Sequence, residues 1–201
     1  MGRHREFDVD KALDAALCVF WRNGYEGASY ADLTAATGVE RPALYSAFGN
    51  KEALFRRALA RYYDRYLDYF PASLALPTSR EVVAHLFSHA ADLNTRYPTH
   101  TGCFLINGAL AGSEDSDAVR EMLIDMRAAS AAQLRERLER AKAEGDLPAT
   151  ASSEALTAYV MAVLHGMAVL AKAGSPRETL EAVAAQALAS WPEGKSGSSG
   201  T

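Results

Sequence analysis

The chain has 201 residues, of which 49% are hydrophobic, and its formal net charge at pH 7 is −4. This length and composition allow a sizeable core in one large domain or two small ones. Two cysteines, with no signal peptide expected, do not make a disulfide framework, so we expect a cytoplasmic protein. No stretch reaches the roughly 18 continuous apolar residues of a membrane span, so we expect no membrane-spanning segment.

The first predicted helix covers residues 9 to 23. Asp8 is suited to cap its N-terminus, and Asn23-Gly24 ends it. Its apolar residues follow helical spacing and are Val9, Leu13, Ala16 and Phe20. Cys18 lies beside Leu17 within this helix, and we expect it to belong to the core.

Residues 29 to 51 read as two short helices joined by a tight turn. Ser29 is a helix N-cap, and Asp32 three residues later is the acidic half of a capping box. Leu33 and Ala36 are expected on one face of this first helix. Gly38 is suited to end the helix and turn the chain.

The second short helix has two very different sides. Pro42 is tolerated in its first turn, and Leu44 and Phe48, four residues apart, are placed to pack on the core. The residues left to face outward are Arg41, Ala43, Tyr45 and Ser46. An arginine, small side chains and a tyrosine suit base edges and phosphates, so the pattern predicts a DNA-reading helix-turn-helix.

The remainder of the chain also predicts helices. A fourth helix runs from about 51 to 69 behind the cap Asn50, with an apolar stripe of Phe55, Leu59, Tyr62, Tyr66 and Tyr69. Pro71 and Pro77 are expected to break the segment that follows. Further helices are expected at about 78–96, 103–111, 116–144, 152–173 and 176–191. No alternating apolar and polar run predicts a strand, so the fold class is all-α with nine helices.

The distribution of charge does not oppose DNA binding. Residues 1–57 carry eight basic and eight acidic residues, and the rest of the chain holds the whole negative excess. A local basic edge is available from Arg3, Arg5, Arg22, Arg41 and Lys51. The weak net charge predicts low non-specific affinity for DNA.

Residues 7 to 55 resemble the DNA-binding domain of the TetR family of transcriptional repressors. The resemblance rests on the Gly24-Tyr25 turn, Leu33, Thr37-Gly38-Val39, Leu44-Tyr45, Phe48 and Lys51-Glu52. Beyond residue 70 it rests on helix count and length. It implies a nine-helix, TetR-like homodimer that binds double-stranded DNA at a palindromic operator and responds to a small-molecule effector. The implied divisions are a DNA-binding domain at 1–50, a ligand-binding and dimerisation domain at 51–192 and a disordered tail at 193–201.

The resemblance also implies roles for individual residues. The expected DNA-binding set is Ser29, Tyr30, Arg41, Pro42, Ala43, Tyr45, Ser46 and Lys51. Arg41 is expected to contact a base, and Tyr45 and Lys51 to contact phosphates. The stretch Arg3-His4-Arg5 is either an arm in the minor groove or a disordered start. The last two helices, rich in alanine, are expected to pair with a second subunit.

The effector is less well defined by sequence. Residues expected to line its pocket are Tyr62, Tyr66, Phe87, Cys103, Phe104, Asn107, Met126 and His165, with ordinary core packing as the alternative for each. Asn107 either anchors a ligand or hydrogen-bonds a neighbouring turn. Cys103, expected at a helix N-terminus, is either a sensor of electrophiles and oxidants or an inert thiol.

Two alternatives involve histidines. His85 and His89 are four apart on one helical face, and with His100 and Cys103 they make a metal site conceivable. We expect neither a metal nor a cofactor, because the position of a third ligand is not defined. The alternative to a regulator is an enzyme that uses Cys103 as nucleophile with His100 or His89 as base, although no residue is identified for an oxyanion hole.

Overall fold

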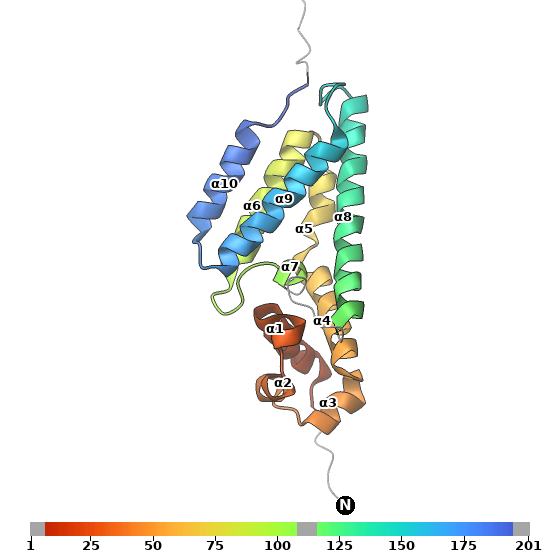
Figure 1. Ribbon diagram of the computed structural model, residues 1–201, viewed down its shortest axis with the longest axis vertical. Helices are drawn as coiled ribbons and strands as arrows, with labels where there is room; N and C mark the ends of the chain where they lie inside the picture. The colour runs from red at the N-terminus through yellow and green to blue at the C-terminus, as the bar shows by residue number, and fades with distance from the viewer. Residues whose placement is uncertain (1–6, 108–115, 195–201) are drawn as a thin grey trace, which may run out of the picture. The chain divides into compact units, whose positions relative to one another are not determined.

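The computed structural model describes residues 7–107 and 116–194, and the chain within these ranges forms ten helices and no strand. The helices are α1 (Val9–Gly27), α2 (Tyr30–Thr37), α3 (Arg41–Phe48), α4 (Lys51–Tyr66), α5 (Tyr69–Leu74), α6 (Ser79–Arg96), α7 (Phe104–Asn107), α8 (Asp117–Ala143), α9 (Ser153–Lys172) and α10 (Arg177–Ala189) (Figure 1). The all-α prediction is confirmed. The stretch Arg3-His4-Arg5, the end of the helix predicted at 103–111 and most of the tail predicted at 193–201 lie outside the described residues.

The additional helix is α5, and it arises where the fourth helix was predicted to continue to Tyr69. That prediction was wrong, because α4 ends at Tyr66 and a new helix begins three residues later. Pro71 does not break this segment, since it lies in the first turn of α5. A backbone N–H at that position has no partner within the helix, so proline removes no hydrogen bond there.

Two compact units make up the chain: the first comprises residues 1–67 and 104–123, and the second comprises 68–103 and 124–201. In the first unit, α1 packs on α2, α4 and α7. Its centre is a group of aromatic rings with edge-to-face contacts: Trp21 and Tyr62 have centroids 4.8 Å apart, and Phe55 and Phe104 have centroids 5.1 Å apart. These contacts join α1 to α4 and α4 to α7, and α2 and α3 pack on α1 and α4, respectively.

Helix ends in the first unit follow the predicted caps. Ser29 and Asp32 form the complete capping box of α2, and Gly38 ends that helix with a φ of 66°. A positive φ of this size is accessible to glycine at little steric cost, so Gly38 makes the turn into α3. Gly24, with a φ of 71°, interrupts α1 where the helix was predicted to end.

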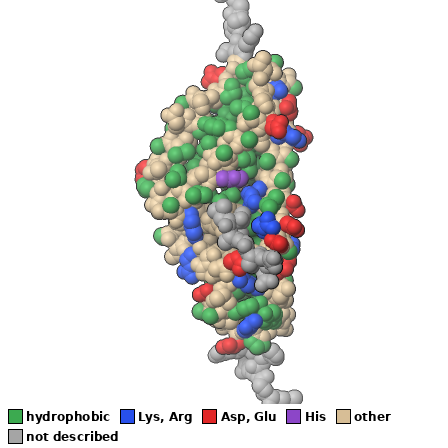
Figure 2. Space-filling view, in the orientation of Figure 1, with side chains coloured by type: hydrophobic (Ala, Val, Ile, Leu, Met, Phe, Trp, Pro, Cys, Tyr) green, Lys and Arg blue, Asp and Glu red, His purple; other side chains and the backbone are tan. Residues whose placement is uncertain are grey.

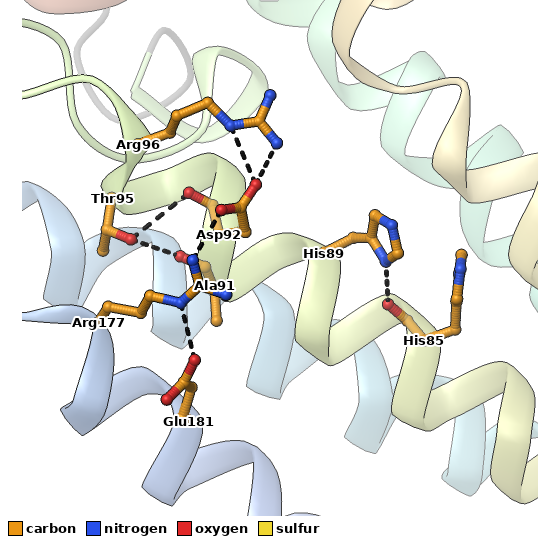
Figure 3. A network of polar contacts seen from close by, with 8 residues as sticks. All are labelled: His85, His89, Ala91, Asp92, Thr95, Arg96, Arg177 and Glu181. Carbon is orange, nitrogen blue, oxygen red and sulfur yellow. Dashed lines mark hydrogen bonds and ion pairs between the residues drawn. The ribbon is translucent and has the colours of Figure 1, made fainter.

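In the second unit, α6 packs on α5, α9 and α10. The core contains Val83, Phe87, Leu138, Val160 and Trp191, all buried. Asp92 on α6 accepts hydrogen bonds from Arg96 of the same helix and from Arg177 at the start of α10, which also pairs with Glu181 (Figure 3). This network joins the N-terminal end of α10 to α6.

The prediction that Cys18 belongs to the core was wrong, because this residue is exposed. Helical spacing did not imply burial at two other positions: Ala36 is exposed although Leu33, one turn earlier, is buried, and Val9 keeps 40% of its surface accessible. Helical spacing shows which side of a helix a residue lies on, but the helices packed against it determine how far around the helix burial extends.

Candidate nucleic-acid interface

Helix α3 has one buried side and one exposed side. Leu44 is 2% exposed and Phe48 is 4% exposed, so these two side chains anchor the helix on the first unit. The opposite side presents Arg41, Pro42, Tyr45 and Ser46 as exposed residues, with Ala43 partly exposed. The structure therefore shows the amphipathic helix that the sequence predicted, with its polar side accessible to a large partner.

A network of polar and aromatic contacts covers the N-terminal part of this surface. The Tyr45 hydroxyl donates to the Tyr30 hydroxyl at 2.7 Å, and Arg41 Nη2 donates to the Tyr45 oxygen at 3.2 Å. The Lys51 backbone N–H, at the start of α4, donates to the Tyr30 oxygen at 3.1 Å. The network thus joins α2, α3 and the N-terminus of α4.

The two tyrosines of this network have shifted pKa values. The hydrogen bond with Tyr30 first, and then the one with Arg41, lower the pKa of Tyr45. Burial first, and then the bond with Tyr45, raise the pKa of Tyr30. Tyr45 is therefore the more acidic of the two tyrosines, and the Arg41 guanidinium lies beside its hydroxyl.

Lys51 occupies a helix N-terminus, where backbone N–H groups favour anions. Asn50 caps this helix by accepting from the Ala53 N–H at 2.8 Å. The Lys51 ammonium lies 4.6 Å from the centroid of the Tyr25 ring, and burial lowers the pKa of Lys51. The role of Tyr25 was not predicted, since the sequence marked it only as part of a turn and gave no sign of a contact with a residue 26 positions later.

The eight residues predicted for an effector pocket divide between the two units. Tyr62, Tyr66, Phe104 and Asn107 belong to the first unit, and Phe87, Cys103, Met126 and His165 belong to the second. Tyr62, Phe87 and Phe104 are fully buried. Asn107 donates from Nδ2 to the Trp21 carbonyl oxygen at 3.1 Å, so its partner lies on α1 and not in the neighbouring turn that the sequence offered as one alternative.

The histidines of α6 contact their neighbours closely. His85 and His89 lie near each other on α6 (Figure 3). Their ring centroids are 3.9 Å apart, and the His89 ring stacks on Tyr69. His85 Nδ1 lies 2.7 Å from the Ser73 hydroxyl oxygen, and burial lowers the pKa of His85. Within residues 7–107 and 116–194, no group of three or more histidine, cysteine or carboxylate side chains is arranged to hold a metal ion.

Comparisons with known proteins agree with this geometry. Residues 12–58 match the family model for bacterial regulatory proteins of the tetR family, and residues 80–187 match a tetracyclin repressor-like C-terminal domain. The chain is 36% identical over 194 residues to the HTH-type transcriptional repressor ComR of Escherichia coli (strain K12), with 96% of this chain and 92% of that protein covered. It is 28% identical over 189 residues to the repressor BdcR of the same organism, with 92% and 90% covered.

A solved structure extends the likeness to a complex with DNA. A cysteine mutant of the TetR family transcriptional regulator CifR, complexed with 26-base-pair double-strand operator DNA, matches with a TM-score of 0.88 and 44% sequence identity. The match covers 95% of this chain and 100% of that one. The fold and the exposed side of α3 define a helix-turn-helix DNA-binding protein. The chain belongs to the TetR family, and it is a transcriptional regulator.

Proposed function

We propose that the chain is a homodimeric repressor that binds a palindromic operator through α3 and releases it when an effector occupies the C-terminal domain. The observation that carries this proposal is the exposed side of α3 on a helix anchored by Leu44 and Phe48. The operator complex of CifR supports it. A single recognition helix reads few base pairs, whereas a two-fold pair reads two half-sites about 34–36 Å apart.

Within this proposal, each DNA-facing residue has a defined task. Arg41 donates two hydrogen bonds to a guanine, and Pro42 and Ala43 contact thymine methyl groups. Tyr45, Ser46 and Lys51 contact phosphates, and Ser29 with Tyr30 lies at the phosphate backbone. Residues 1–50 form the DNA-binding domain of this assignment, and residues 51–192 form the domain for ligand and dimer.

The dimer is supported by an uncovered apolar surface in the second unit, which we call the α9/α10 face. On α9 it comprises Ala155, Ala158, Tyr159, Ala162 and Val169, and on α10 it comprises Ala182, Ala185 and Ala189, all exposed. The Tyr159 side chain reaches from α9 to α10, where its hydroxyl lies 3.5 Å from the Ala187 carbonyl oxygen. Hydrophobic side chains gather over these helices in the space-filling view (Figure 2).

By length and composition, α9 is apolar enough to cross a membrane. Only 28% of its most apolar 18-residue stretch is buried within the chain. A core helix of one subunit is covered more completely than this. A second copy of the chain covers the same apolar face without a membrane, and α9 and α10 are the last two helices, where the family places its dimer contact.

For the effector, we propose a small apolar ligand or an electrophile or oxidant that reacts at Cys103. Cys103 is partly exposed. Occupation of the C-terminal domain then changes the separation of the two recognition helices, and affinity for the operator falls by the difference in effector binding between the two states. The enzyme alternative has no support among the relatives, which are transcriptional regulators.

The test is selection of a binding sequence from random DNA by the purified full chain, followed by affinity measurements with Arg41→Ala. We expect a palindromic sequence, and we expect the variant to lose about 1–3 kcal/mol of discrimination at one base pair in each half-site. Ser88→Ala, an exposed change on α6, is the control. Failure of the wild-type chain to enrich any sequence contradicts the proposed function, and an equal loss by Arg41→Ala on all sequences contradicts the base-reading role.

A further inference from the structure

The Tyr30 side chain is held at its hydroxyl oxygen and on a face of its ring. Its oxygen receives two hydrogen bonds, from the Tyr45 hydroxyl at 2.7 Å and from the Lys51 backbone N–H at 3.1 Å. Its face stacks on the Tyr45 ring, with centroids 5.3 Å apart and an interplanar angle of 27°. Contacts from α3 and α4 therefore hold the ring of an α2 residue in one orientation.

The Arg41 guanidinium lies on this fixed ring. Its Cζ atom is 4.0 Å from the Tyr30 ring centroid and 5.4 Å from the Tyr45 ring centroid. Its Nη2 atom donates a hydrogen bond to the Tyr45 oxygen. A guanidinium placed over an aromatic face keeps most of its N–H groups at the edge of the pair, where they remain available to an acceptor.

We propose that Tyr30 is a positioning residue that determines base specificity through Arg41. This inference rests on the proposed function, in which Arg41 reads a base, and it adds the reason why Arg41 reads only one. A long, exposed arginine that samples many rotamers satisfies different bases by reorienting. An arginine held on a ring presents its donors in one direction, and it loses less conformational entropy when it binds.

The hydrogen bonds at Tyr30 favour this role over that of an independent phosphate ligand. Tyr30 and Tyr45 each carry one hydroxyl proton, and the hydrogen bond between them uses the proton of Tyr45. The Tyr30 oxygen is also engaged by the Lys51 N–H. A contact between Tyr30 and DNA would therefore involve a hydroxyl that is already hydrogen-bonded within the network of Tyr45 and Arg41. Removing Tyr30 changes how Arg41 is held.

The experiment compares Tyr30→Leu, which removes the ring, with Tyr30→Phe, which keeps the ring and removes the hydroxyl. Affinities of the full chain are measured for the selected operator and for every single-base variant of one half-site. Arg41→Ala identifies the base pair that Arg41 reads. Tyr63→Leu on α4 is the matched control, since Tyr63 is also a partly exposed tyrosine of the first unit.

We expect Tyr30→Leu to reduce discrimination at the Arg41 base pair by about threefold to tenfold, and at the other positions by less than about twofold. Tyr30→Phe keeps the ring, so its loss at the same base pair is smaller. In the Arg41→Ala background, Tyr30→Leu has no further effect on that base pair. A uniform loss at all positions, or unchanged discrimination with Tyr30→Leu, overturns the proposal.

A second measurement needs no DNA and separates this proposal from the proposed function. The ring current of Tyr30 shields the Arg41 guanidinium, so the Arg41 side-chain NMR resonance shifts in Tyr30→Leu and less in Tyr30→Phe. Thermal unfolding of each variant shows whether it folds. An unshifted Arg41 resonance in folded Tyr30→Leu overturns the positioning role even if the operator is bound. Failure of the wild-type chain to select an operator, with the resonance shifted as expected, overturns the proposed function and with it the specificity role, and leaves the Tyr30–Arg41 contact established.

Discussion

Substitution of Ala162 by glutamate tests the dimer at the centre of the α9/α10 face. Ala162 is exposed on α9, one helical turn from Tyr159 and about two turns from Val169, which are 39% and 47% exposed. In a two-fold dimer across this face, Ala162→Glu places two carboxylates in an apolar contact. Each has to stay charged in that contact or take up a proton.

Proton uptake sets an upper limit on the free energy by which the two glutamates weaken the dimer. Neutralising a glutamate whose ordinary pKa is about 4.3 requires about 3.7 kcal/mol at pH 7, and two copies require about 7 kcal/mol per dimer. This corresponds to a dimer Kd weaker by about five orders of magnitude, so a dimer with a Kd of about 1 nM becomes largely monomeric at about 10 µM. Because two protons are taken up, the Kd recovers by about a thousandfold between pH 7 and pH 5.5.

The assay is sedimentation equilibrium of the full chain across a range of concentrations at both pH values. Ala129→Glu on the exposed side of α8 is the control for the added charge, and it is expected to leave the dimer intact. If Ala162→Glu remains a dimer at sub-micromolar concentration and pH 7, the carboxylates are solvated and this face is not the interface. A wild-type chain that is monomeric at high concentration refutes the argument directly.

Two further predictions concern charge. Lys51→Ala should weaken binding to all DNA sequences and reduce the slope of log affinity against log salt concentration by about 1, as the loss of one phosphate contact does. An unchanged salt slope would contradict the phosphate contact. The hydrogen bond with Arg96 first, and then the nearby Arg177 charge, lower the pKa of Asp92. The Asp92 ion pairs therefore contribute fully to the free energy of unfolding above the ordinary carboxyl pKa of about 4. This contribution disappears as the pH falls through the lowered pKa of Asp92. In urea unfolding, we expect Asp92→Asn to be less stable than wild type at pH 7 by up to about 1 kcal/mol, a small value because the ion pairs are partly exposed. The difference in stability should shrink below about pH 4. A loss of stability that does not depend on pH would contradict the ion-pair origin.

Sequence reasoning located the helix-turn-helix because its signals are local. The Ser29–Asp32 capping box and the turn at Gly38 each depend on residues at most four positions apart, and each is present in the structure. The four-residue spacing of Leu44 and Phe48 was enough to predict which side of α3 is buried. Boundaries without a strong local signal were less certain, and the end of α4 at Tyr66 was predicted three residues too late.

The amino-acid sequence by itself determined the all-α class, the family and the outward side of α3, because caps, turns and helical periodicity act within a few residues. Only the tertiary structure decided which distant side chains meet. Tyr30 and Tyr45 are 15 positions apart, and Tyr25 and Lys51 are 26 apart. No spacing rule relates such residues, since their contact depends on how whole helices pack. The placement of Arg41 on a fixed tyrosine ring, on which the specificity argument depends, follows from that packing.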